Sequence, residues 1–127
     1  FMFKGGEDNT DNRTYFVEGP IGNKVENLRK LSKILEAETL KSGEGALIHL
    51  RKWDVKYGTL WNTPSQMKDL TCSAWAARHP KADFACSAEI PYTDNAGVEV
   101  NAENLRGFGA NIAKSLAEYF AAPEAKK

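Results

Sequence analysis

Apolar residues that recur at intervals of three and four positions predict three amphipathic helices along the chain. The first follows Asn23 and ends at the glycine-containing turn 42–45. The second follows the turn 62–65 and ends before Pro80, and the third is capped by Asn101 or Asn104. In chain order, the apolar stripes are Val25, Leu28, Leu31 and Leu35, then Met67, Leu70, Ala74 and Ala77, then Leu105, Phe108, Ile112, Leu116 and Phe120.

Four shorter segments have the β-branched, aromatic or alternating character of strands. They span residues 14–17, 46–50, 56–61 and 82–90, and residues 93–100 are predicted to form a loop. This order of elements favours an α/β fold, with a layered mixed or parallel sheet and helices on both faces. We expect residues 1–122 to belong to a single domain and residues 123–127 to form a frayed tail.

The charge balance excludes some classes of partner. Seventeen Lys and Arg residues match seventeen Asp and Glu residues, so the formal net charge is zero, whereas nucleic-acid-binding proteins usually carry a basic excess. No apolar run approaches the roughly 20 residues that a membrane-spanning helix needs. We therefore expect neither a nucleic acid nor a membrane as partner. Cys72 and Cys86 could form one disulfide or remain free thiols.

Known nucleotide-binding and nucleophile motifs do not occur in the chain. It has no G-x-S-x-G, no P-loop and no dinucleotide fingerprint. Its two histidines, His49 and His79, lack a Glu or His at the spacing of a helical zinc site. His49 is expected to be a partly buried, hydrogen-bonded strand residue, and His79 to complement the dipole at a helix end.

Glu89 is the candidate for chemistry. It follows the small or apolar run Phe84-Ala85-Cys86-Ser87-Ala88 near the end of the predicted strand. Alternation places it on the face shared with Ala85 and Ser87. Ligands of open α/β sheets collect at the carboxyl ends of strands, where a partly desolvated carboxylate could move protons. Alternatively, Glu89 pairs with a lysine or arginine, or points to water.

Several segments together resemble the C-terminal part of the catalytic domain of zinc carboxypeptidases, the metallocarboxypeptidase family. The segment Phe84 to Tyr92 resembles the family's last central strand, which ends in the catalytic glutamate. The helix from Asn104 to Phe120 resembles its closing helix, and Tyr57 to Thr63 resembles a strand-and-loop segment of bacterial members. Residues 14–17, with the turn and long helix after them, resemble the stretch that follows the family's final zinc histidine.

The resemblance implies zinc-dependent peptide hydrolysis. Glu89 would then be the general acid/base, Trp61 would wall the pocket for a substrate side chain, and Tyr92 would hydrogen-bond nearby. The alternative for Trp61 is core packing beneath the loop, and for Tyr92 it is packing at the rim of the site; packing is favoured for both, because most large aromatic residues serve packing. The partners implied are a peptide substrate and the upstream part of the same domain, and bacterial members of the family are often exported.

The chain also departs from the family pattern. It has no His-x-x-Glu pair followed by a later histidine, so the zinc ligands are expected upstream of Phe1 and this chain alone is expected to bind no zinc and to be inactive. No tyrosine occurs between Leu60 and Trp75, where the family's mobile-loop tyrosine belongs, and Tyr57 lies too early. Two alternatives stay open: an inactive relative that binds peptides or glycans, and an unrelated small α/β interaction domain.

Overall fold

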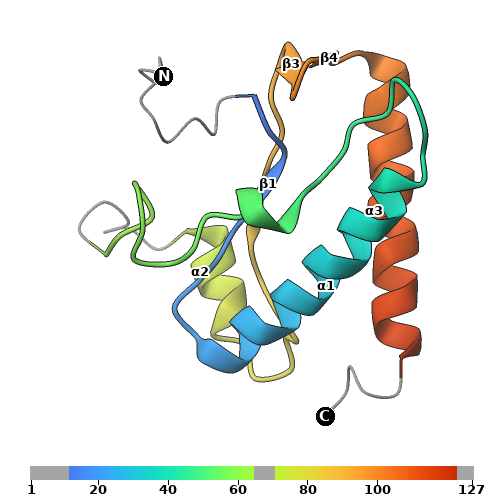
Figure 1. Ribbon diagram of the computed structural model, residues 1–127. Helices are drawn as coiled ribbons and strands as arrows, with labels where there is room; N and C mark the ends of the chain where they lie inside the picture. Colours follow the sequence, from blue (N-terminus) through green and yellow to red (C-terminus); the bar gives the residue numbers. More distant parts are fainter. Residues whose placement is uncertain (1–11, 65–70, 123–127) are drawn as a thin grey trace.

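The computed structural model describes residues 12–64 and 71–122 of the chain (Figure 1). Its helices are α1 (Gly22–Leu40), α2 (Cys72–Ala77), α3 (Ala102–Ala121) and the 3-10 helix η1 (Arg51–Trp53). Its strands are β1 (Tyr15–Val17), β2 (Ser87–Glu89), β3 (Asp94–Asn95) and β4 (Val98–Glu99). None of the described helices is both long and apolar enough to cross a bilayer.

The short strand β1 is the centre of the fold. On one side it pairs antiparallel with β2, with Phe16 opposite Ala88. On its other side single parallel bridges join Thr14 to His49 and Val17 to Val55. Three segments that are far apart in the sequence therefore run side by side through the middle of the molecule.

The two faces of β1 are buried against different groups of side chains. Phe16 points into the main core, formed with the apolar stripes of α1 and α3, which lie side by side (Figure 1). Tyr15 and Val17 point the other way and pack with Trp53 and Val55. The alternation of a strand thus gives one three-residue segment two buried faces, and α2 lies on the other side of β1 from α3 in Figure 1.

A capping box of two asparagine side chains fixes the start of α3. The side chain of Asn101 accepts a hydrogen bond from the backbone N–H of Asn104 at 2.9 Å, and the side chain of Asn104 accepts one from the N–H of Asn101 at 2.9 Å. This reciprocal pair satisfies two donors that the first helical turn leaves free. Both asparagines that the sequence offers as caps are therefore used.

The structure confirms the mixed helix-and-strand character but not every predicted element. Residues 46–50 and 56–61 form no strand, and only isolated bridges at His49 and Thr59 and turns occur there. Residues 93–100, predicted as a loop, contain the β3–β4 hairpin. Within the described residues, the sheets are two-stranded and antiparallel, and a layered parallel sheet is not among them.

Two other sequence-based predictions are only partly covered by the described residues. The predicted second helix is present as α2, whose N-cap Thr71 accepts from the N–H of Ala74 at 3.1 Å. Met67 and Leu70, from the stripe assigned to it, lie outside the described residues, as does the predicted tail 123–127.

Candidate functional site

A pocket of about 640 Å³ opens between β2, α2 and the turn that follows Tyr57. Its walls combine small and aromatic apolar side chains with a few charged and hydroxyl groups. Its lining includes Glu18, Tyr57, Trp61, Arg78, Ser87 and Glu89. A cavity of this size and mixed character is typical of a small-molecule or side-chain site.

The strand β2 places Glu89 on this pocket. Phe84 and Cys86 pack against the core below α1 and α3, whereas Ala85, Ser87 and Glu89 line the pocket. The alternation predicted for residues 82–90 is therefore confirmed at these positions, although only residues 87–89 are regular strand. Glu89 is exposed rather than partly desolvated.

Glu89 is free of the ion pairs that join charged residues elsewhere in the described part of the chain. The carboxylate of Glu18, by contrast, is 5% exposed and receives two hydrogen bonds from Arg29, from Nε at 2.8 Å and from Nη2 at 2.9 Å. Arg78 reaches the same pocket from the C-terminal end of α2 and has no carboxylate partner among the described residues. The pocket thus offers one unpaired anion and one unpaired cation.

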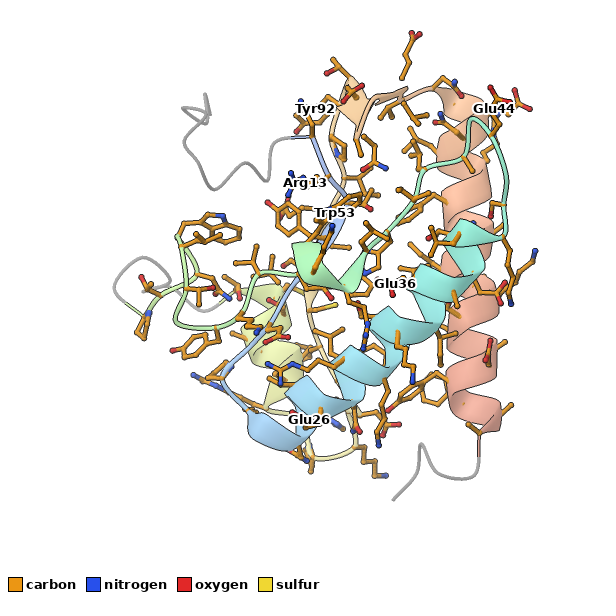
Figure 2. The ribbon with its side chains drawn as sticks, viewed as in Figure 1. Arg13, Glu26, Glu36, Glu44, Trp53 and Tyr92 are labelled. Carbon is orange, nitrogen blue, oxygen red and sulfur yellow. The ribbon has the colours of Figure 1, made fainter. Side chains whose placement is uncertain are left out.

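Of the two aromatic residues predicted to lie at the site, Trp61 and Tyr92, only Trp61 lines the pocket of Glu89. Trp61 also packs against the Tyr15–Val17 face, and its indole Nε1 is buried without a hydrogen-bond partner. Tyr92 is 97% exposed and does not line the pocket; Figure 2 shows it at the end of the molecule that carries β3 and β4. Tyr57, set aside in the sequence as too early, does line the pocket.

A cluster of three polar side chains, which the sequence analysis did not predict, lies inside the core. The Ser32 hydroxyl lies 2.8 Å from His49 Nε2 and donates to Asp54 Oδ2 at 2.5 Å. Asp54 Oδ1 also accepts from the backbone N–H of Phe16 at 2.8 Å. The predicted hydrogen bonding of His49 is confirmed, but its side chain, predicted to be partly buried, is fully buried at 1% exposed.

Burial changes the acid–base properties of this buried cluster. Loss of water lowers the pKa of His49 to about 4, and it raises the pKa of Asp54 to about 6. Ser32 lies on α1, His49 in the segment beside β1, and Asp54 just after η1, so the cluster ties three elements together. The three side chains are buried, so the cluster holds the core together and does not meet a substrate.

The remaining candidates for chemistry are His79 and the two cysteines. Nδ1 of His79 accepts a hydrogen bond from the backbone N–H of Lys81 at 3.2 Å. Cys72 and Cys86 are both free thiols, and burial raises the pKa of Cys86 to about 11. Within residues 12–64 and 71–122, no three His, Cys, Asp or Glu side chains come together to hold a metal ion.

Comparison of the chain with protein-family models, with characterised proteins and with solved structures gives no significant match.

Proposed function

We propose that the pocket between β2 and α2 binds a peptide, and that Glu89 acts there as the general acid/base of a zinc carboxypeptidase-like hydrolysis. The observation that supports this proposal is the position of Glu89: an unpaired carboxylate on the same pocket as Trp61. Had Glu89 been held in an ion pair away from any cavity, a purely structural role would be favoured. The family resemblance of residues 84–92 adds the identity of the reaction.

The chemistry asked of Glu89 is proton transfer. Its carboxylate would take a proton from the attacking water and deliver that proton to the leaving amine when the peptide bond breaks. Its exposure lets water and substrate reach the carboxylate oxygens. Trp61 would form an apolar wall for a substrate side chain, and the free Arg78 guanidinium would attract an anionic group of the peptide.

Zinc belongs to this proposal but not to the described residues. A bound zinc ion supplies Lewis-acid chemistry to peptide hydrolysis. The described residues do not fit a zinc site, since they contain no cluster of three ligating side chains. The ligands would therefore have to come from outside residues 12–64 and 71–122.

The test uses a longer protein that contains this chain together with the metal ligands. Glu89→Gln is expected to abolish peptide hydrolysis while zinc content, measured by metal analysis, stays unchanged. The matched control is Glu99→Gln, which removes an exposed carboxylate of β4 and should leave turnover intact. Hydrolysis retained in Glu89→Gln removes Glu89 from the mechanism. The 127-residue chain itself, dialysed after exposure to zinc, is expected to retain no stoichiometric metal.

A second candidate function is peptide or glycan binding without catalysis. It is favoured by one observation: the described residues form a pocket with an apolar wall but no metal-ligand group. Under this alternative, ligand binding to the pocket would quench or shift the fluorescence of Trp61, and Trp61→Phe would remove that signal. No hydrolysis would then appear in the longer protein at any zinc concentration.

A further inference from the structure

The outer edge of β2 carries main-chain groups that the fold leaves open. Phe16 sets the pattern: its N–H donates to Asp54 Oδ1, and its carbonyl accepts from the Val55 N–H, both at 2.8 Å. Both main-chain groups of Phe16 therefore point away from β2. In an antiparallel ladder this makes Phe16 and Ala88 a non-hydrogen-bonded pair, so the N–H and carbonyl of Ala88 point away from β1 as well.

Nothing in the described part of the chain covers this edge. All three residues of β2 are exposed. Among the described residues, no backbone hydrogen bond joins Cys86, Ala88 or Ile90 to a partner on the side away from β1. Within the regular strand, Ala88 therefore presents one main-chain donor and one main-chain acceptor to an added strand.

We propose that this edge binds an extended peptide, which adds to the sheet as a strand beside β2. Such a peptide would pair with Ala88 through its main chain. It would run along the rim of the pocket, because Ser87 and Glu89 turn their side chains into that pocket. Every second peptide side chain would then face the pocket, where the aromatic wall of Trp61 and the free guanidinium of Arg78 contribute selectivity.

The dimensions of the edge favour a peptide over a second copy of this chain. The strand has three residues, and Pro91, which has no N–H, closes it two positions later. Stable protein–protein interfaces use roughly 20–30 residues on each side, which so short an edge does not supply. A peptide needs only the edge and the pocket beside it.

Ala88→Pro tests the proposal, since it removes the outward N–H. Proline is tolerated on edge strands where its nitrogen faces solvent, so the variant is expected to fold with the circular dichroism spectrum of the parent chain. The matched control is Ser87→Pro, whose nitrogen faces β1 and whose substitution is expected to destabilise the chain. The probe is a fluorescently labelled hexapeptide of alternating threonine and valine, and its affinity is measured by fluorescence anisotropy.

The expected result is a loss of affinity of at least tenfold in Ala88→Pro. The same hexapeptide methylated on every internal amide nitrogen should fail to bind the parent chain, a result that keeps its meaning even if Ala88→Pro does not fold. Unchanged affinity in either experiment overturns the proposal. So does sedimentation showing a dimer of the parent chain that Ala88→Pro abolishes. Hexapeptide binding by the 127-residue chain needs neither zinc nor hydrolysis, so the proposal for this edge and the proposal for the catalytic role of Glu89 are tested separately.

Discussion

Nε2 of His49 and Oδ1 of Asp54 lie 3.5 Å apart inside the core, with their side chains 1% and 7% exposed. The Ser32 hydroxyl touches both groups, and the ring of His49 also bonds to the backbone of Thr14. Between about pH 4 and pH 6 the folded pair holds a single proton, because the pKa of His49 has fallen to about 4 and that of Asp54 has risen to about 6.

When His49 or Asp54 is replaced, the free energy of unfolding is expected to change with pH, and in opposite directions for the two variants. The pKa of Asp54 rises from 3.8 to about 6 on folding, so its contribution to stability is present at low pH and is lost as pH rises through 6. The pKa of His49 falls from 6.5 to about 4, so its contribution is present above pH 6.5 and is lost as pH falls toward 4. In the parent chain the two trends nearly cancel.

His49→Gln should therefore lose stability as pH rises from 4 to 6, and Asp54→Asn should lose it as pH falls from 6.5 to 4. In each variant the free energy of unfolding is expected to fall by about 3 kcal/mol over its pH range, because each pKa shift is roughly two units. Urea unfolding at half-unit pH intervals, compared with the parent chain, measures both slopes. Stability that changes with pH in the same direction in both variants would contradict the opposite pKa shifts of His49 and Asp54.

Arg29→Met is expected to destabilise the chain by about 1–3 kcal/mol. It leaves the buried Glu18 carboxylate without its two hydrogen bonds, and the half-exposed position of Arg29 keeps the loss moderate. The pKa of Arg29 is raised by its bond to Glu18, as expected for a guanidinium held in its charged form. Denaturant unfolding gives the magnitude.

The control for this prediction is Glu26→Ala. Glu26 also contacts Arg29, through Nη1 at 3.0 Å, but it is 66% exposed, so its loss should cost less than about 0.5 kcal/mol. Glu18→Gln placed in the Arg29→Met background should recover part of the lost stability, since a neutral amide is less costly to bury than a carboxylate. Equal losses in Arg29→Met and Glu26→Ala would show that burial of Glu18 does not matter.

Ala96→Asn is expected to stabilise the β3–β4 hairpin by about 0.5–1 kcal/mol. Ala96 and Gly97 form the two-residue loop between Asn95 and Val98, with φ angles of 53° and 90°. A turn with positive φ at both positions favours Asn followed by Gly, and Ala is strained there. Ala96→Val should lower the thermal unfolding midpoint, and a rise in both variants would exclude this conformation.

The sequence predicted those features that depend on neighbours along the chain. The stripes of α1 and α3 follow from the periodicity of a helix, and the cap of α3 from Asn101 and Asn104. The alternation that places Glu89 on the opposite face of the strand from Cys86 follows from the strand period alone. The sequence did not predict the β3–β4 hairpin because its loop, Ala96-Gly97, lacks the Asn-Gly pair that is typical of such a turn.

Tertiary structure alone decided which distant residues meet. Nothing local to Ser32, His49 or Asp54 announces their contact, because it arises only when α1 packs beside β1 and η1. The same holds for the pocket, whose Glu89, Trp61 and Arg78 come from separate elements, and for the open edge of β2, which depends on where Phe16 directs its main chain. Local spacing fixes the face a side chain occupies, whereas its partners depend on how the elements pack.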